Sequence, residues 1–308
     1  MSLSTVLPKN PFDINASEAY AKWRERKLTD YPENIEDLIV EVRDPRALTS
    51  SEHKAILHRC QKANMAIYAS QCGSDPDKDI PRLIGNQFGM FHLDSNLLAE
   101  EDGITKLAVS EASERQLYIP YTNRPIKWHT DGYYNPESRQ IRGMLLHCVS
   151  SAIEGGENAL MDQEMVYLLM RDANPDLVRA FMQPDAMTIP ARMEEDKIAR
   201  AAETGPVFST HPVTGDLHMR YTARTRSIEW KNNSVTLAAV SFIEQLLSSD
   251  SNYIFRGMLE PGMGLICNNV LHDRSSFSDS PVHPRVLYRA RYYDRISATS
   301  LSDTFPDT

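Results

Sequence analysis

Residues 128–132 read Trp-His-Thr-Asp-Gly, and this short stretch decides most of what the sequence says about the fold. It sets an imidazole and a carboxylate two residues apart. On an extended strand, residues i and i+2 face the same side, so His129 and Asp131 are expected to point in one direction. A second imidazole comes much later, in the stretch Asn269-Val270-Leu271-His272-Asp273-Arg274. These three side chains form a candidate metal-binding set.

The order of the surrounding segments strengthens this interpretation. A His-x-Asp pair is common by chance, and the chain carries a second copy, His92-Leu93-Asp94, which we expect to lie away from the metal. The first copy is followed by an apolar strand over 144–149, the turn Glu154-Gly155-Gly156-Glu157-Asn158, and finally His272 with an arginine-bearing strand. Two imidazoles and one carboxylate that leave other positions open are the ligand set of non-haem Fe(II) oxygenases.

This order of motifs resembles the TauD/TfdA (taurine dioxygenase-like) family of Fe(II)- and 2-oxoglutarate-dependent oxygenases. The resemblance extends from about Ala66 to Tyr293, which is most of the chain. It rests on Trp128-His129-Thr130-Asp131, the Gly155-Gly156 turn, Leu271-His272-Asp273-Arg274-Ser275-Ser276-Phe277, and Pro284-Arg285-Val286-Leu287-Tyr288-Arg289. The Leu-His-x-Arg-x-x-Phe part is also similar to the γ-butyrobetaine hydroxylase branch.

The resemblance implies that His129, Asp131 and His272 are the metal ligands and the catalytic centre. In the family, 2-oxoglutarate fills two of the remaining coordination positions and O₂ fills the third. The expected cofactors are therefore Fe(II), 2-oxoglutarate as co-substrate, and O₂. Related halogenases have a small residue where this chain has Asp131, so the carboxylate favours hydroxylation.

Arginines on the last predicted strand are the expected anion-binding groups. By period two, one face of that strand carries Arg285, Leu287, Arg289, Arg291 and Tyr293. The resemblance implies that Arg285 binds the far carboxylate of 2-oxoglutarate, for which a permanently charged planar fork is suited. It also implies that Arg289, deeper on the same face, meets an anionic group of the substrate. The competing interpretation is that Arg289 pairs with a nearby acid and never meets substrate.

Three further residues complete the candidate site. The family usually has threonine two residues after the Gly-Gly turn, whereas this chain has Asn158, whose amide can donate a hydrogen bond to the same carboxylate. Tyr133 and Tyr134 directly follow the metal motif and are expected to line the substrate cavity. Their aromatic faces would also suit a quaternary ammonium group. Packing in the core is the competing interpretation of both tyrosines.

Composition narrows the classes of partner. The 308 residues carry a formal net charge of −9 without a basic stripe, which argues against a nucleic-acid partner. Neither a signal-peptide-like run over 1–17 nor eighteen consecutive apolar residues are present, which argues against a membrane. Four scattered cysteines (Cys60, Cys72, Cys148 and Cys267) indicate a reduced cytoplasmic protein with free thiols. We expect a small-molecule substrate, and the sequence leaves a homo-oligomer open.

Short strands bounded by turn signals predict a mainly β fold with flanking helices, a cupin-like double-stranded β-helix or jelly roll. We expect one domain over residues 1–308, with an N-terminal arm over 1–16 and a loose tail over 297–308. Helices are predicted over 17–28, 50–64, 79–88, 163–172, 175–182 and 234–247. The predicted strands include 37–42, 66–69, 106–110, 115–119, 141–149, 158–161, 186–189, 207–210, 216–221, 253–256, 264–268 and 286–293.

The charged stretch Arg192–Thr204 predicts a solvated helix face. In the resembling family this region often forms a mobile cover over the site, so we also expect a cover over about 191–205.

The expected function is hydroxylation or oxidative cleavage of a small polar metabolite, anionic or zwitterionic, with release of succinate and CO₂. One alternative is a cupin-like metal enzyme that keeps the two histidines and the aspartate but has no use for Arg285. Another is a non-enzymatic jelly roll that binds a metal or a ligand.

Overall fold

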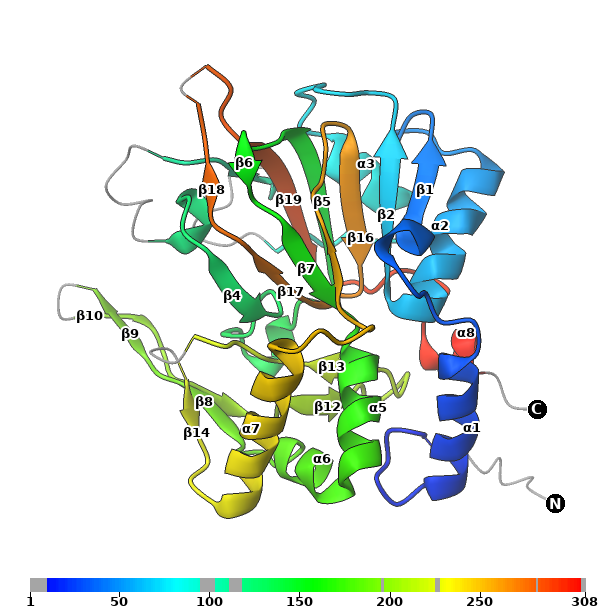
Figure 1. Cartoon of the computed structure of the whole chain (residues 1–308). Coiled ribbons are helices and arrows are strands. Elements are labelled where there is room, and N and C mark those ends of the chain that lie inside the picture. The colour runs from blue at the N-terminus through cyan, green and yellow to red at the C-terminus, as the bar shows by residue number, and fades with distance from the viewer. Residues whose placement is uncertain are drawn as a thin grey trace.

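Two β-sheets lie face to face in the upper part of the molecule (Figure 1). The computed structural model describes residues 10–94, 103–110, 118–194, 197–224, 228–280 and 282–305. The larger sheet has the order β1-β2-β16-β5-β19-β3. Its strands are β1 (Ile39–Val42), β2 (Met65–Ser70), β16 (Met263–Cys267), β5 (Gly143–Ser150), β19 (Val286–Tyr292) and β3 (Thr105–Leu107). The β1–β2 pair is parallel and the other pairs are antiparallel.

The smaller sheet is antiparallel and has the order β15-β7-β17-β4. Its strands are β15 (Phe255–Gly257), β7 (Asn158–Met161), β17 (Leu271–Arg274) and β4 (Ile126–His129). A short ladder of β18 (Phe277–Ser278) with β6 (Glu154–Gly155) extends beside it. Leu146 and Leu265 of the larger sheet share a buried core with Leu160 and Phe255 of the smaller one. Inward side chains of both sheets therefore meet in one interior.

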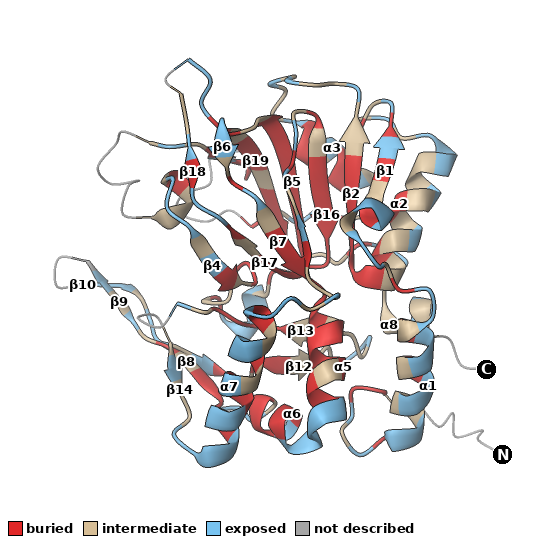
Figure 2. Ribbon diagram, in the orientation of Figure 1, coloured by how far each residue is buried: buried red, intermediate tan, exposed pale blue. Residues whose placement is uncertain are grey.

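Helices cover the outer face of the larger sheet. They are α2 (Ser50–Ala63) and α3 (Ile80–Gln87), and their buried Ile56 and Ile84 join Tyr68 and Tyr292 in a second core cluster. Figure 2 shows the resulting layering, with buried strands in the middle and exposed residues on the outer helices. Alternate residues of β19 thus face either these helices or the interior between the sheets.

A helical layer lies below the sheets, inserted in the chain between β7 and β15 (Figure 1). It contains α5 (Gln163–Ala173), α6 (Pro175–Phe181), α7 (Ser234–Leu247), the strands β8 (Met187–Ile189), β11 (Glu203–Gly205) and β14 (Glu229–Trp230), and the hairpin β12 (Phe208–Thr210) with β13 (Leu217–Met219). Its buried residues belong to the same core as those of the two sheets. A hairpin of β9 (Arg192–Glu194) and β10 (Lys197–Arg200) projects from it.

The described part of the N-terminal segment, from residue 10 onward, packs against the rest of the protein. Helix α1 (Ser17–Leu28) places Trp23 against Phe12 at 5.0 Å, edge to face, and Phe12 is fully buried. Arg171 donates hydrogen bonds to the carbonyl oxygens of Pro11, Asp13 and Ile14. Residues 1–9 of the expected arm lie outside the described residues.

All six predicted helices are present within two residues at either end. Three local expectations are wrong. Residues 192–204 form the β9–β10 hairpin and β11 instead of a helix, and Met193 and Ile198 are cross-strand partners there. An isolated pair of apolar residues makes no helical stripe to bury, so local propensity did not decide the outcome. In the expected strand 115–119, residues 115–117 lie outside the described residues, and Ile119–Tyr121 is a 3₁₀ turn containing Pro120.

The expected loose tail is also wrong as far as it is described. Helix α8 (Leu301–Thr304) begins with a capping box between Ser300 and Asp303, and Thr299 is buried. The amide of Leu301 donates to Asp216 at 2.6 Å. Capping and this long-range hydrogen bond hold a segment whose composition is typical of a loop. Residues 306–308 lie outside the described residues.

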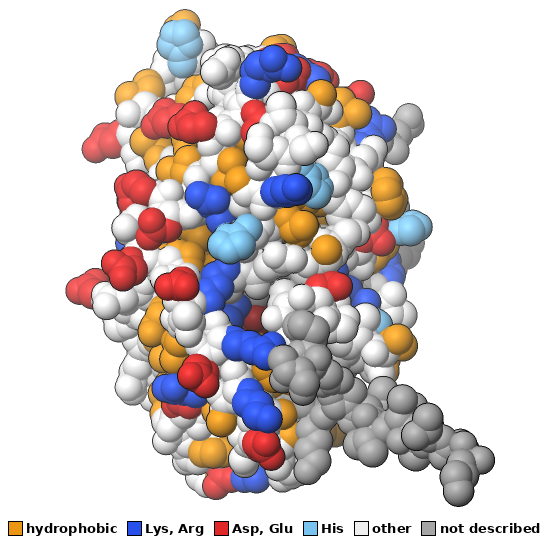
Figure 3. Space-filling model, turned by 90° about the vertical axis from the view of Figure 1, so that its right-hand side faces the viewer, with side chains coloured by type: hydrophobic (Ala, Val, Ile, Leu, Met, Phe, Trp, Pro, Cys, Tyr) orange, Lys and Arg blue, Asp and Glu red, His pale blue; other side chains and the backbone are white. Residues whose placement is uncertain are grey.

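The surface and the cysteines have the following character in the described residues. On the face drawn in Figure 3, basic and acidic side chains are interspersed with single hydrophobic ones. Among the described residues no helix is long and apolar enough to cross a membrane. The four cysteines are free thiols, and Cys60, Cys148 and Cys267 are buried in the core.

The close approach of β16 to its neighbours makes a stability prediction. A Cβ at Gly264 would lie 2.3 Å from the ring of Tyr68 and 2.4 Å from the carbonyl oxygen of Leu146. We expect Gly264→Ala to lower the free energy of unfolding by about 1–3 kcal/mol, the usual cost of over-packing. Urea titration followed by circular dichroism measures this change. The exposed Ser241→Ala is the control and should change it by no more than about 0.5 kcal/mol, so equal stabilities would contradict the packing argument.

Candidate metal centre and active site

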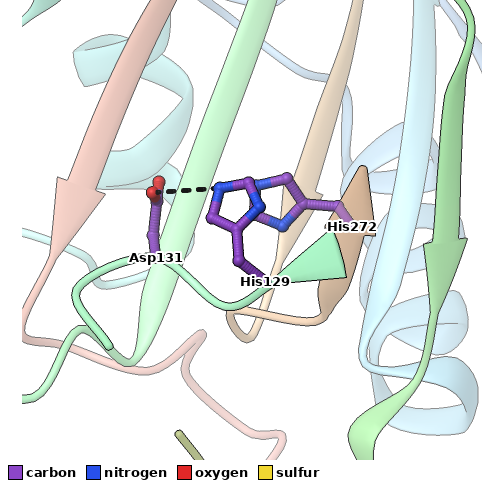
Figure 4. A group of neighbouring side chains, drawn as sticks. All are labelled: His129, Asp131 and His272. Carbon is purple, nitrogen blue, oxygen red and sulfur yellow. Dashed lines mark ion pairs between the residues drawn. The ribbon is translucent and has the colours of Figure 1, made fainter. Parts of the chain in front are cut away.

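Three predicted metal-binding residues come together on the inner side of the smaller sheet. His129 ends β4 and His272 lies on β17, and the two are direct partners in the antiparallel register. Their rings are 4.2 Å apart. Asp131 follows in the turn after β4, with its Oδ1 4.0 Å from Nε2 of His129 (Figure 4). Ligand atoms of the three residues all lie within 4.8 Å of one another.

The second His-x-Asp pair lies elsewhere, as expected. His92 pairs with Asp294 at 2.8 Å and is exposed. Asp94 is buried, but it accepts hydrogen bonds from Tyr293 and Arg139 and pairs with Arg291. Neither residue belongs to a metal-binding group among the described residues.

Backbone hydrogen bonds set the tautomer of both imidazoles. Nδ1 of His129 lies 2.9 Å from the carbonyl oxygen of Lys127, and Nδ1 of His272 lies 3.0 Å from that of Val270. A carbonyl only accepts, so each Nδ1 must carry the proton, and each Nε2 keeps its lone pair for a ligand. This is the usual outer contact of a metal-binding histidine.

Asn269 holds the backbone of the aspartate in place. Its Oδ1 accepts from the Asp131 amide at 2.8 Å, and its Nδ2 donates to the carbonyl oxygens of Asp131 and Ile141 at 3.0 and 2.7 Å. Asn269 itself adopts a left-handed conformation, with φ of 52°. Asparagine is among the few residues that tolerate this conformation, which ties the turn before β17 to the turn after β4. Sequence reasoning missed this residue, although it lies three positions before His272.

Burial and neighbouring charges set the protonation states of Asp131 and His129. Burial raises the pKa of Asp131, but the nearby Arg289 and Arg291, together with the two imidazoles, outweigh burial and hold that pKa below its usual value. For His129, burial and the neighbouring His272 lower the pKa to about 3, so the ring is neutral at pH 7. A carboxylate and neutral imidazoles are the protonation states that metal binding requires.

The residues present fit a divalent metal. Oδ2 of Asp131 is buried and has no hydrogen-bond partner, which is costly unless a cation satisfies it. The Nδ1 contacts leave each Nε2 as the nitrogen with a lone pair in the neutral ring. The donor set of two imidazoles and one carboxylate is that of a facial Fe(II) site.

Arg289 is not the free cation that the sequence led us to expect. Its Nη1 donates to Oδ1 of Asp131 at 3.2 Å, and its side chain is only 12% exposed. A charge-assisted hydrogen bond to the metal-site carboxylate is the competing interpretation stated above, and the structure favours it. The contact arises because Asp131, remote in sequence, turns its carboxylate toward β19, and a role of Arg289 in substrate binding stays a prediction.

Arg285 faces the interior as expected. It is 5% exposed, and among the described residues no ion pair or side-chain hydrogen bond engages its guanidinium. The guanidinium lies 5.1 Å from the ring centre of Phe277, and burial lowers its pKa. A Cβ at Gly156 would come within 3.2 Å of its Nε, so the Gly-Gly turn leaves room for this side chain. The carboxylate of Asp279, which accepts from the Arg285 backbone amide at 2.9 Å, partly offsets the effect of burial on the Arg285 pKa. A buried guanidinium without an ion-pair partner is suited to an anion, and the role of Arg285 stays a prediction.

A second arginine lies beside it. Arg274 stacks on Phe277 at 4.7 Å from the ring centre and donates to the carbonyl oxygens of Thr122 and Arg124. Burial and the neighbouring Arg285 lower its pKa to about 9. Its Nε is buried without a partner. The sequence signal was present, since Arg274 stands two residues after His272, but no role was assigned to it.

Asn158 makes a different contact from the expected one. Its Nδ2 donates to the carbonyl oxygen of Asp273 at 2.8 Å, and its Oδ1 is buried without a partner. One N–H of the amide is therefore already engaged by the main chain of β17. The second N–H remains as a donor.

The two tyrosines extend from the metal site toward the projecting hairpin. The Tyr133 ring lies edge to face with His129 at 6.4 Å, and the Tyr134 ring follows at 5.2 Å from Tyr133. The Tyr134 hydroxyl accepts from Arg291 at 3.0 Å, and the guanidinium of Arg200 lies 5.5 Å from the Tyr134 ring centre. The hairpin of the expected cover thus reaches the tyrosines beside the metal ligands, and its role as a cover stays a prediction.

The Asn269 contacts predict an effect on metal affinity. In Asn269→Gly the left-handed backbone is retained, but all three hydrogen bonds to the Asp131 turn are lost. We expect the affinity for Mn(II), measured by calorimetry on metal-free protein, to fall about 10- to 100-fold, as for other outer-sphere partners. Asp30→Gly is the matched control, because Asp30 is exposed and also has a positive φ of 52°. Equal affinities for both variants would contradict this role of Asn269.

Comparison with known proteins places the chain in a family. The family model described as taurine catabolism dioxygenase TauD, TfdA family matches residues 82–291. A uridine-5'-phosphate dioxygenase of Streptomyces sp is 27% identical over 204 residues, which cover 63% of this chain and 71% of that protein.

Solved structures share the fold at low sequence identity. An asparagine oxygenase in complex with Fe(II), 3-hydroxyasparagine and succinate has a TM-score of 0.57 at 12% identity and covers 93% of this chain and 92% of its own. A taurine dioxygenase from Burkholderia xenovorans has a TM-score of 0.52 at 16% identity, with 85% and 89% covered. The family model spans more than half of the chain and includes both ends of the metal-binding set. The chain therefore belongs to the TauD/TfdA family and is an oxygenase that depends on Fe(II) and 2-oxoglutarate.

Proposed function

We propose that this oxygenase hydroxylates, or oxidatively cleaves, a small polar metabolite that carries an anionic group, with release of succinate and CO₂. One observation carries the proposal. His129, Asp131 and His272 converge in the same interior in which Arg285 presents a buried guanidinium without an anion. A metal site and a separate anion site together suit a co-substrate that binds the metal at one end and an arginine at the other.

The metal ligands in this proposal are Nε2 of His129, Nε2 of His272 and the carboxylate of Asp131. Bound Fe(II) and 2-oxoglutarate supply the oxidising chemistry, in which dioxygen oxidises a substrate C–H bond while 2-oxoglutarate loses CO₂. The chain contributes orientation: the backbone carbonyls of Lys127 and Val270 fix both rings, and Asn269 fixes the aspartate turn. Three protein ligands leave the remaining coordination positions for co-substrate and O₂.

Arg285 is the proposed partner of the far carboxylate of 2-oxoglutarate. Support comes from its burial and from its place at the start of β19, on the face that carries Arg289 toward Asp131. Asn158 is the proposed neighbour of the same carboxylate through its second N–H. Since its first N–H is held by Asp273, we propose Asn158 as the weaker of the two contacts.

Tyr133 and Tyr134 are the proposed substrate-side wall. Tyr133 lies against the ring of His129, so a substrate bound beside the metal would contact it. Arg289 holds Asp131 in this proposal and does not bind substrate. The cation next along the wall is Arg200, beside Tyr134, which suits an anionic group at the far end of the substrate. The phosphate in the name of the uridine-5'-phosphate dioxygenase agrees with this class.

We also infer that the two facing sheets form a double-stranded β-helix. Antiparallel strands from distant parts of the chain alternate within each sheet, and both inner faces enclose one core that ends at the metal-binding set. Such an arrangement places ligands from two neighbouring strands, β4 with the turn after it and β17, around an interior, as a jelly roll of the cupin type can.

Succinate formation from 2-oxoglutarate tests the function. With Fe(II) and O₂, we expect turnover that is stimulated by small carboxylates, sulfonates or phosphate esters. Arg285→Ala should raise the 2-oxoglutarate requirement by the equivalent of about 2–5 kcal/mol, because a buried charge loses its partner, and should leave Mn(II) binding nearly intact. Arg179→Ala, a surface arginine paired with Asp176, is the control. Unchanged 2-oxoglutarate dependence in Arg285→Ala would refute the assignment, and a neutral hydrophobic best substrate would refute the substrate class.

The contact between Arg289 and Asp131 separates a positioning role from a substrate role. A positioning role predicts that Arg289→Ala weakens Mn(II) binding about 10-fold or more and slows substrate-free 2-oxoglutarate decay. A substrate role predicts that both stay normal and that only substrate-stimulated turnover is lost. Calorimetry with Mn(II) and the succinate assay without substrate decide between them, and Arg289→Lys should restore part of the metal affinity.

A further inference from the structure

A pocket lined by charged and polar side chains includes Asn269, the residue that also holds the Asp131 turn of the metal-binding set. Its volume is about 220 Å³. Its walls come from residues 140–142 before β5, the β12–β13 hairpin, the β16–β17 loop and residues 295–300. None of the metal-binding residues or of the proposed substrate residues lines it, and Asn269 is the point where the two sites meet.

Basic groups outnumber acidic ones in this pocket. Arg142, Arg295, His211 and His218 line it together with one carboxylate, Asp216. Asp216 is already engaged, since its Oδ1 accepts from the Leu301 amide and its Oδ2 from the Thr214 hydroxyl, both at 2.6 Å. It lies 4.0 Å from Arg295. The single acid therefore balances at most one of the two arginines.

Arg142 is the cation without an ion pair among the described residues, and the carboxylates of Asp216, Asp294 and Glu137 act on it only at longer range. It is half-buried, and among the described residues no ion pair or side-chain hydrogen bond engages its guanidinium. Arg295, by contrast, donates to Asn64 and to the carbonyl oxygen of Thr299 and lies 3.9 Å from Glu164. Burial lowers the pKa of Arg142, which is the expected sign of a cation held away from water without a full partner.

Neutral donors surround Arg142. The ring of His218 has no hydrogen-bond partner among the described residues. Burial together with Arg142 lowers its pKa to about 3, so the ring is neutral and offers one N–H. Gln140 lines the same pocket. A guanidinium surrounded by neutral N–H donors binds a small anion more strongly than it binds water, because its hydrogen bonds to an anion are charge-assisted.

We propose that this pocket binds a small anion, a carboxylate or a phosphate group, with Arg142 as its charged partner and His218 as a neutral donor. The volume suits a ligand of a few heavy atoms and excludes a nucleotide or a peptide. This site is separate from the proposed function and does not depend on it. It also differs from the Arg285 site, which faces the interior between the sheets.

The same geometry connects the pocket with the metal site. Arg142 follows Ile141, whose carbonyl oxygen accepts from Asn269 Nδ2 at 2.7 Å, and Asn269 also holds both backbone groups of Asp131. An anion that fixes residues 140–142 would therefore stabilise the Asp131 turn. Coupling of this kind is reciprocal, so binding in the pocket and order in the turn should support each other.

Calorimetric titration of the full-length, metal-free protein tests the site, with inorganic phosphate and acetate as probes and chloride as the matched-ionic-strength blank. We expect binding in the wild type and in Arg285→Gln, which removes the other unpaired cation. Arg142→Gln should weaken binding about tenfold or more, the effect of losing one charge-assisted contact. Arg142→Lys should keep part of it, and Arg179→Gln should bind as the wild type does. Tighter binding of phosphate would identify a phosphate group as the natural ligand, and tighter binding of acetate would identify a carboxylate.

Three outcomes would overturn the proposal: no binding of either anion, equal binding by wild type and Arg142→Gln, or loss of binding in Arg285→Gln alone. Circular dichroism melting shows whether Arg142→Gln is folded, and Arg142→Lys keeps the test decisive if it is not. Hydrogen exchange tests the coupling separately. Phosphate should slow exchange of the Asp131 amide in the wild type and not in Arg142→Gln, and unchanged exchange in both would refute the coupling.

Discussion

The antiparallel pairing of β4 with β17 is the contact on which the site depends. It sets His129 directly opposite His272, although 142 positions separate them in the chain. Backbone hydrogen bonds of the ladder hold the two Cα atoms, and each ring is then oriented by a carbonyl two residues earlier on its own strand. A slip of one residue would turn one imidazole to the other face of the sheet, so the register is a condition for metal binding.

Charge balance in the interior follows from this arrangement. Arg289 reaches Asp131 from the larger sheet, and Arg291 pairs with Asp94 and contacts Tyr134. These buried arginines have acidic partners, which reduces the cost of taking them out of water. Arg285 differs, because its guanidinium makes no ion pair among the described residues, and the neighbouring Asp279 accepts from its backbone amide instead. The proposed co-substrate site thus differs from the other interior arginines in having no ion pair before a ligand binds.

The helical layer supports the site as well as covering one end of the sheets. Arg220 joins the two parts, since its Nε donates to the carbonyl oxygen of Tyr133 and its Nη2 to that of Glu203 in β11. A Cβ at Gly205 would lie 2.7 Å from this guanidinium, so the strand needs glycine at that position.

The sequence by itself determined the six predicted helices, which depend on amphipathic stripes, and the identity of the metal-binding set, which depended on the order of motifs and on the family resemblance. It also indicated a mainly β fold. The register of β4 with β17, the turn of Asp131 toward Arg289 and the clamp by Asn269 came only from the tertiary structure. The physical reason is that each joins residues more than a hundred positions apart, where neither periodicity nor propensity carries information. Residues 192–204 show the same limit locally: a charged stretch without an apolar stripe has no intrinsic preference, and pairing with neighbouring strands decided its form.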